Sequence, residues 1–395
     1  MIKILKIIIG ICSTVIILTI PVTYFLSFKD EVVLEEIEIE EEVETPSTTI
    51  QTPEPEPIIP PEEKLISQMT NKEKVGQLFI FGVEGNQTIE PSNKQFLLDT
   101  QPAGVILFQR NITDGNQLKN LIVELQTTNK IKMFVAIDQE GGVVPRIKWN
   151  KMLTISQKEI STEDAFNIAK ERGTILKNLG INMNLAPVVE YVSSPNAFIY
   201  SRTFSGDLDQ VISKSISTVE GYKEAGIISV PKHFPGHGEN DIDPHKNLVS
   251  VDISSAKWDE YILPFSSLLQ KTNVDTIMIG HILFQNIDKF PSSISYEILT
   301  NRLRNHLNYK GVVISDDMQM RALSSFGSVE EIAKQALLAG EDMLIYSKFV
   351  NSADGLQRKV YNYILDEVEK GNINIDEKVK RVLRLKIQYD LMDTD

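Results

Sequence analysis

The densest set of residues that could do chemistry lies in one short segment, PKHFPGHGENDIDPH, at residues 231–245. It holds three of the five histidines of the chain together with Glu239, Asp241 and Asp243. Asp243 and His245 stand two residues apart, on either side of Pro244. In such a pair the carboxylate can orient the imidazole and raise its basicity, which suits proton transfer near neutral pH.

Two other interpretations of this segment remain open at this stage. His233, His237 and His245 could be metal ligands, because imidazole is a common ligand of zinc and related ions. Their H-x3-H-x7-H spacing matches no common zinc motif, and the chain contains no H-E-x-x-H. Alternatively, the segment is a structural loop whose histidines bond only to backbone groups.

Further polar residues follow or end apolar, β-rich runs elsewhere in the chain. Each one alone could be a surface residue or a helix cap. Several such residues together are harder to explain by chance. The carboxyl ends of parallel strands meet at one edge of a sheet, so these side chains would lie together. These residues are Asp138, Glu140, Lys232, His233, His281, Asp316 and Asp317.

The runs that would position these residues alternate with helical patterns. Continuous apolar runs joined by helical crossovers are typical of buried parallel strands. Eight of them predict an α/β fold, a single (β/α)8 TIM-type barrel, with its active site at the carboxyl ends of the strands. No G-x-G-x-x-G follows a strand and no P-loop occurs, which disfavours a nucleotide-binding fold. The runs are residues 76–83, 103–108, 133–138, 182–190, 227–234, 274–282, 311–317 and 341–346.

Composition excludes several functions without identifying one. The 395 residues include one Cys, which rules out an intrachain disulfide and a Cys-cluster metal site. The net charge of −14 argues against nucleic acid as a partner. Residues 29–63 alone carry thirteen acidic residues and one Lys, so the remainder of the chain is almost neutral.

The chain divides into three predicted regions. Residues 1–28 form a membrane anchor or signal peptide, since the run from Ile7 to Phe28 is uncharged and long enough to span a bilayer. A transmembrane helix with the catalytic domain outside is the first choice, a cleaved signal the second and a lipid on Cys12 the third. Residues 29–63 predict a disordered acidic, Pro-rich linker, and 64–395 the catalytic barrel.

Several strings in residues 64–395 resemble glycoside hydrolase family 3, in particular its bacterial β-N-acetylglucosaminidases. The most specific is KHFPGHG followed by Asp-x-His, because members acting on β-glucosides or β-xylosides usually lack that histidine. The order and approximate spacing of the strings also match the family. The others include MTNKEKVGQLFIFG, IDQEGGVVPR, LGINMNLAPVVE, SRTFSGD, GVVISDDMQM and AGEDMLIY.

The resemblance implies a role for each matching residue. Asp316, the first Asp of SDDM, would be the nucleophile of a retaining glycosidase. His245, oriented by Asp243, would be the acid and base. No cofactor and no metal ion is implied. Residues resembling those that grip the sugar hydroxyls and acetamido group are Asp138, Arg146, Arg202, Lys232 and His233.

The sequence departs from the family pattern at several positions, none of which removes a proposed catalytic group. They leave the sugar preference and the mobility of the loop open. Val143 replaces the usual Arg after QEGG, and Glu190 replaces the usual Asp after APVV. In the loop, the departing residues are Glu239, Asn240 and Pro244.

The expected function is therefore an exo-acting β-N-acetylglucosaminidase that removes terminal GlcNAc from peptidoglycan-derived or related saccharides. A phosphorylase or a β-glucosidase of the same family is an alternative. So is a catalytically silent, membrane-tethered glycan-binding protein. The expected partners are a saccharide substrate and, through the N-terminal segment, the membrane.

Overall fold

The computed structural model describes residues 59–244, 246–349 and 355–393. Eight parallel strands form its centre, in the order β5-β4-β3-β2-β1-β10-β9-β7. Each strand falls within one of the eight apolar runs predicted from the sequence. They are β1 (Phe79–Gly82), β2 (Gly104–Leu107), β3 (Phe134–Ile137), β4 (Met183–Asn184), β5 (Ile228–Ser229), β7 (Thr276–Ile279), β9 (Val312–Asp317) and β10 (Met343–Tyr346).

The sheet is nearly closed into a barrel by the chain that follows β5. Single parallel bridges pair Lys232 with Val188 on one side and Phe234 with Ile279 on the other. The Phe234 amide donates to the Met278 carbonyl oxygen over 2.8 Å. A separate short pair, β6 (Val249–Ser250) and β8 (Ile282–Leu283), lies outside this sheet. The predicted TIM-type barrel is therefore confirmed.

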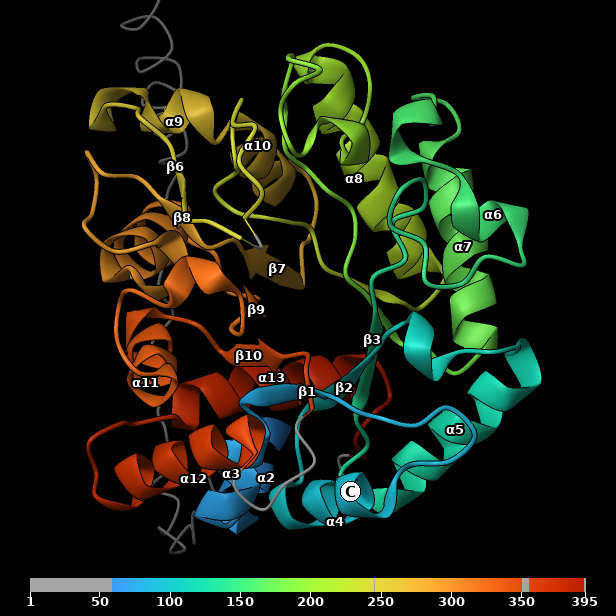
Figure 1. Ribbon diagram of the computed structural model, residues 1–395, viewed down its shortest axis with the longest axis vertical. Coiled ribbons are helices and arrows are strands. Elements are labelled where there is room, and N and C mark those ends of the chain that lie inside the picture. Colours follow the sequence, from blue (N-terminus) through green and yellow to red (C-terminus); the bar gives the residue numbers. More distant parts are fainter. Residues whose placement is uncertain (1–58, 245, 350–354, 394–395) are drawn as a thin grey trace, which may run out of the picture. The chain divides into compact units, whose positions relative to one another are not determined.

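Helices lie around the strands and connect each one to the next (Figure 1). Several of them begin at side-chain caps; for example, Asp114, Asp207 and Ser328 accept hydrogen bonds from first-turn amides. The connecting helices are α4 (Pro91–Thr100), α5 (Gly115–Thr128), α6 (Lys151–Thr154), α7 (Ala165–Asn178), α8 (Leu208–Glu224), α9 (Trp258–Tyr261), α10 (Leu263–Lys271), the π-helix η6 (Glu297–His306) and α11 (Val329–Ala339). The others are α2 (Pro61–Gln68), α3 (Asn71–Gly76), α12 (Leu356–Glu369) and α13 (Asp376–Gln388).

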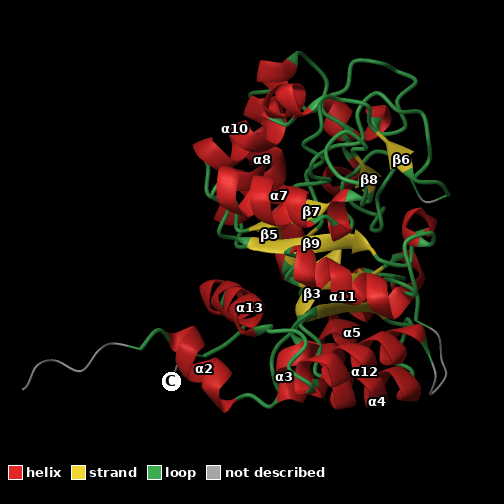
Figure 2. Cartoon of the chain, turned by 90° about the vertical axis from the view of Figure 1, so that its left-hand side faces the viewer, coloured by secondary structure: helices red, strands yellow, loops and turns green. Residues whose placement is uncertain are grey.

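The strands are buried on both faces, which explains why their sequences are continuously apolar. Alternate residues point inward, and Ile80, Ile106 and Ile314 belong to one cluster that fills the barrel. Phe79 and Val105 point outward and pack in the layer beneath the helices. Figure 2 shows the strands enclosed between helical layers.

The amino-terminal boundary of the described chain differs from the predicted linker. Helix α2 begins at Pro61, so the last three residues of the predicted linker are helical. Glu62 accepts two hydrogen bonds from Arg384, and Glu63 pairs with Lys380, both on α13. These ion pairs fix the end of the acidic segment against the barrel. Within residues 59–393 as described, no helix is long and apolar enough to cross a membrane; the predicted anchor at 1–28 lies outside the described residues.

Lys386 on α13 is a buried lysine whose ionisation should affect the stability of the fold. Its side chain is fully buried, and its Nζ donates to the Lys132 carbonyl oxygen over 2.8 Å. Burial lowers the pKa of Lys386 to about 7. Above that pH the unfolded chain binds the extra proton and the folded one does not, so stability rises with pH by up to about 1.4 kcal/mol per unit.

We therefore expect the free energy of unfolding in urea to rise between pH 7 and 9 in the wild-type protein. It should rise less in Lys386→Met. A difference between the two proteins that does not change with pH would contradict this prediction.

Candidate active site

A cavity of about 450 Å³ opens at the carboxyl ends of the strands. Its floor includes inward-pointing residues of the barrel, Ile106 and Ile345. The polar residues predicted from strand ends converge on it. Its charged and imidazole side chains are Asp138, Glu140, Arg146, Arg202, Lys232, His233, His237, Asp316, Asp317, Arg321 and Lys348.

One wall is a network of two carboxylates and three cations. Lys232, only 2% exposed, lies between Asp138 and Glu140, with Nζ 2.7 Å from Asp138 Oδ1 and 2.6 Å from Glu140 Oε1. Arg202 forms a two-pronged pair with Glu140, at 2.7 and 2.9 Å. Arg146 Nη2 donates to Asp138 Oδ2 over 3.1 Å. The two carboxylates are thus held in fixed positions by complementary charges.

This network determines the ionisation of its carboxyls. Burial acts to raise the pKa of Asp138, but Lys232 and Arg146 outweigh it and lower the pKa below the usual value. Burial likewise opposes the effect of Arg202 and Lys232 at Glu140, and the net pKa there is also lowered. Both groups are ionised at neutral pH. Their contribution to stability is present above about pH 4 and is lost in stronger acid, as they become protonated.

Glu190 connects the two histidines of the KHFPGHG segment. Its Oε1 lies 2.8 Å from His233 Nδ1 and 3.0 Å from His237 Nδ1, and its Oε2 accepts from the His237 amide over 2.5 Å. Because a carboxylate can only accept, each Nδ1 carries a proton. The lone pair of His233 Nε2 then faces Arg202 Nη2, 3.3 Å away. Burial lowers the pKa of His233 to about 4, so this imidazole is neutral in the working range.

The same geometry bears on the metal interpretation. Among the described residues, Glu190, His233 and His237 are the group whose ligand atoms lie close enough to hold one ion. A metal on His233 Nδ1 would move the proton to Nε2, where it would oppose the N–H of Arg202. The arrangement therefore fits a hydrogen-bonded cluster better than a metal site. His245, the third predicted ligand, lies outside the described residues.

We expect Glu190→Gln to lower kcat/KM by about ten- to hundredfold, because one charged acceptor of several hydrogen bonds is lost. Glutamine keeps only one of the two oxygens. If its carbonyl takes the place of Oε1 and accepts from the imidazoles, its NH2 group faces the His237 N–H that Oε2 now accepts from, so the loop or a ring must shift. Glu239→Gln is the matched control: Glu239 is on the loop that carries His237, but among the described residues it accepts only from Ser193 and Ser194. Equal losses in the two variants would contradict the positioning role of Glu190.

The two neighbouring aspartates at the end of β9 differ in their surroundings. Asp317 accepts from the Gln319 and Ser347 amides and from the Ser347 hydroxyl, so it is fixed in the structure. Asp316 accepts from the Asp317 amide over 2.7 Å through Oδ1, and among described residues its Oδ2 makes no hydrogen bond. Burial acts to raise the pKa of Asp316, but His233, His281 and the amide lower it overall. Asp316 is thus an ionised carboxylate with one oxygen available in the cavity.

The structure brings six of the eight predicted site residues to this cavity: Asp138, Arg146, Arg202, Lys232, His233 and Asp316. Asp243 is described, and its Oδ2 lies 3.3 Å from Lys246 Nζ. His245 lies outside the described residues, while the preceding residue, Pro244, lines the cavity. His281, which also follows a strand, instead bonds Ser293 Oγ and the Asp317 carbonyl oxygen.

Three functional residues were not assigned to the site from sequence. The sequence indicates Glu140 only as the end of an apolar run and His237 only as a metal candidate. It marks Glu190 as a departure from the family pattern. Glu140 and Glu190 bond directly to the predicted site residues Lys232 and His233, and the His237 ring packs edge-on against the ring of His233. The available signal for Glu140 and Glu190 was a carboxylate at or just beyond the end of an apolar run.

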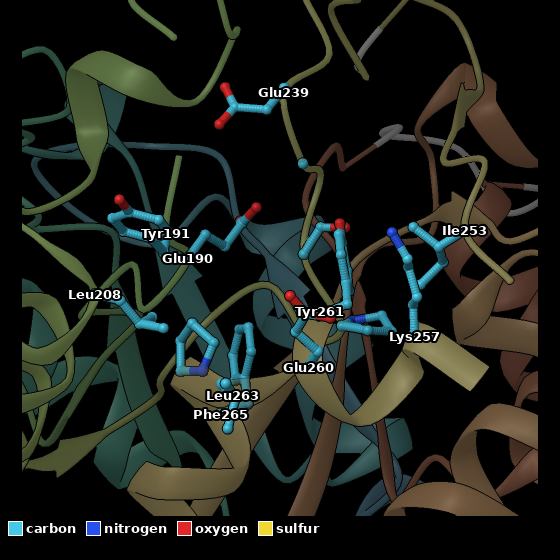
Figure 3. A pocket seen from close by; sticks show the side chains of 14 residues that line it. Glu190, Tyr191, Leu208, Glu239, Ile253, Lys257, Glu260, Tyr261, Leu263 and Phe265 are labelled. Carbon is cyan, nitrogen blue, oxygen red and sulfur yellow. The ribbon is translucent and has the colours of Figure 1, made fainter. Parts of the chain in front are cut away.

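A second cavity, of about 400 Å³, lies behind the loop that carries His237 (Figure 3). Gly236 and Gly238 line it, both with positive φ, which this turn requires. The Tyr261 hydroxyl donates to the Gly236 carbonyl oxygen over 2.7 Å. Glu190 lines this cavity as well. The loop is therefore a wall between two cavities, held by Glu190 and Tyr261.

The sequence is similar to those of known glycoside hydrolases. The model of the family described as "Glycosyl hydrolase family 3 N terminal domain" matches residues 70–385. A β-hexosaminidase of Psychromonas ingrahamii is 31% identical over 275 residues, which is 67% of this chain and 81% of the relative. β-Hexosaminidase A of Pseudoalteromonas piscicida is 28% identical over 331 residues, 76% of this chain. The chain spans 55% of the length of that relative.

Solved structures agree with the sequence comparison. A glycoside hydrolase family 3 β-N-acetylglucosaminidase from Paenibacillus sp. str. FPU-7 has a TM-score of 0.74 and 31% identity. The match covers 82% of this chain and 63% of that one. The family resemblance is therefore confirmed, and this chain belongs to glycosyl hydrolase family 3.

Proposed function

We propose that the protein is a retaining exo-β-N-acetylglucosaminidase that hydrolyses terminal β-linked GlcNAc of peptidoglycan-derived or related saccharides. The observation that carries this proposal is the position of Asp316, whose Oδ2 makes no hydrogen bond to any described residue, in a cavity also lined by Asp138, Lys232 and His233. The names of the relatives and of the similar structures support the same activity.

In the proposed first step, the Asp316 carboxylate attacks the anomeric carbon and the glycosidic C–O bond breaks. His245, protonated and oriented by Asp243, gives its proton to the leaving oxygen. In the second step, the now neutral His245 takes a proton from water, whose oxygen attacks the anomeric carbon and releases Asp316. The Asp138–Lys232–Glu140 network would hold the sugar through its hydroxyls, because ionised groups in fixed positions make strong hydrogen bonds.

The activity is tested by comparing an aryl β-N-acetylglucosaminide with the matching β-glucoside, with and without EDTA. We expect fast, EDTA-insensitive release from the N-acetyl substrate only. Equal release from both sugars would identify a β-glucosidase-like specificity instead. A folded protein that binds glycan and releases neither aglycone would support the silent binding protein.

A phosphorylase is the second candidate. Arg321 and Lys348 line the cavity, and neither forms an ion pair with any residue in the described chain. Two cations without carboxylate partners could hold a phosphate ion as the acceptor in place of water. Acceleration of the reaction by phosphate, with formation of a sugar 1-phosphate, would favour this candidate over hydrolysis.

We expect His245→Ala to slow substrates with poor leaving groups by about 10²-fold or more, and activated aryl glycosides much less, because only the former need a proton on the leaving oxygen. The alkaline limb of the kcat/KM profile should also disappear. The pKa of His233 is about 4 and those of Asp138 and Asp316 are lowered, so above about pH 5 His233 stays neutral and both aspartates stay ionised. Equal rate losses for both substrate types, or an unchanged alkaline limb, would contradict the role of His245.

We also propose that the enzyme acts outside the cytoplasmic membrane, tethered by residues 7–28. The support is the uncharged run in the sequence followed by an acidic, Pro-rich segment. Fractionation of cells producing the full chain should place it with the membranes, and a variant lacking residues 2–58 should be released from them. Recovery of both the full chain and the shortened variant in the soluble fraction would contradict tethering.

A further inference from the structure

A cavity of about 520 Å³ lies at the other end of the barrel from the active site. It is bordered by η6, the turn before β9, the end of α11 and one strip of α13. Gly340 lines it three residues before β10 begins at Met343, so it lies by the amino ends of the strands. Its cationic lining residues are Arg304, Lys310, Lys378, Arg381 and Arg384.

Carboxylates compensate only part of this positive charge. Asp342 is fully buried and accepts from Arg304 Nη2 at 2.6 Å and from Arg381 Nε and Nη2 at 3.0 and 2.8 Å. Arg384 bonds to Glu62. Glu377, the acidic lining residue, is paired with Lys380 on the same helix. The Asp342 carboxylate is thus shared by two guanidinium groups. The two lysines of the lining have no carboxylate partner among the described residues.

Lys378 is the centre of the uncompensated charge. It is half-buried, and within the described residues its Nζ makes no hydrogen bond or ion pair. Burial lowers its pKa; Asp342 acts against this, and the neighbouring Arg381 and Arg304 add to the lowering. Glu341 is fully buried beneath the region, and both its oxygens lack a partner in the described chain. Burial raises the pKa of Glu341 well above its usual value, which weakens its ability to offset the cations.

Donors for an oxyanion are therefore available in the cavity. The Nη1 groups of Arg381 and Arg384 have no acceptor among the described residues, since these side chains bond Asp342 and Glu62 through Nε and Nη2. Lys378, Arg381 and Arg384 follow one another at every third position of α13, along one strip of the helix. Guanidinium and ammonium groups in this arrangement suit the tetrahedral oxygens of phosphate.

We propose that this basal cavity binds a phosphate group, either as free inorganic phosphate or on a small phosphorylated molecule. Lys378 and Arg381 hold the group from within the cavity. Lys310, which is exposed, and Arg384 contribute at its rim. The site is separate from the active-site cavity and does not depend on the function proposed above.

The test measures phosphate binding to the full-length protein by titration calorimetry and thermal shift, at constant ionic strength maintained with NaCl. We expect saturable binding that is weakened about tenfold in Lys378→Ala, because one charge-assisted hydrogen bond is lost. Lys119→Ala, an exposed lysine on α5, is the matched control and should bind phosphate like the wild type. Circular dichroism and glycosidase activity establish that each variant is folded.

A phosphate affinity in Lys378→Ala equal to that of the wild type would overturn the proposal, because phosphate would then bind elsewhere, including the active site. So would a stabilisation that NaCl alone reproduces. Comparison of inorganic phosphate with glycerol 3-phosphate distinguishes the two sources: tighter binding of the ester indicates a phosphorylated molecule, and equal or weaker binding indicates free phosphate. Lys310→Ala, with an exposed side chain, provides a second variant and should show a smaller loss.

Discussion

Asp316→Asn is expected to lower kcat for an aryl β-N-acetylglucosaminide by about 10³-fold or more, because an amide cannot form the glycosyl-enzyme. The fold should persist, since the asparagine carbonyl can still accept from the Asp317 amide, as Asp316 Oδ1 does over 2.7 Å. Steady-state kinetics and circular dichroism on the same preparation measure both effects.

Asp317→Asn is the informative companion variant. The Asp317 carboxylate already accepts hydrogen bonds from Gln319 and Ser347, so its substitution should affect stability more than the chemical step. Asp209→Asn, at an exposed position on α8, controls for the loss of one carboxylate. Wild-type rates in Asp316→Asn, with a severe loss in Asp317→Asn, would transfer the nucleophile assignment to the second aspartate.

The second large effect is expected for Lys232→Met. Lys232 is buried between two ionised carboxylates, and removing it leaves Asp138 and Glu140 close together without their shared counter-ion. Breaking a buried ion pair in this way costs about 3–5 kcal/mol. We expect the free energy of unfolding in urea to fall by that amount and activity to be lost with it.

Lys370→Met is the control for this substitution. It removes the same side chain from a pair with Asp366 in which both partners are more than half exposed. Such pairs contribute about 0–1 kcal/mol, so the variant should unfold almost like the wild type. Lys232→Arg, which keeps the charge, should recover part of the stability. A similar unfolding midpoint for Lys232→Met and Lys370→Met would contradict the importance of the network.

The barrel could be predicted from sequence because its signal is local. Each strand is buried on both faces and is therefore a continuous apolar run, and most runs are followed by a helical pattern. The position of Asp138 and Asp316 at strand ends then placed them at one end of the barrel. The lengths of β4 and β5 were not predictable: the apolar runs at 182–190 and 227–234 are long, but the ladders stop near Pro187 and Pro231, which have no N–H to donate.

The interactions within the site could not be predicted in the same way, because they join residues far apart in the chain. Lys232, after β5, pairs with Asp138 and Glu140, which follow β3, and Arg202 reaches Glu140 from a short 3-10 helix after β4. Nothing local distinguishes Glu190 as the acceptor for two histidines more than forty residues later. Such pairings depend on the closure of the barrel, which brings these loops to a common end.

The most direct test of the proposed mechanism is to trap the glycosyl-enzyme. A 5-fluoro-N-acetylglucosaminyl donor should form the covalent intermediate faster than water can release it. Proteolysis and mass spectrometry should then find the sugar on the peptide containing Asp316, and Asp316→Asn should remain unlabelled. Labelling of another residue, or continued hydrolysis with inversion at the anomeric carbon and no labelled peptide, would contradict the account.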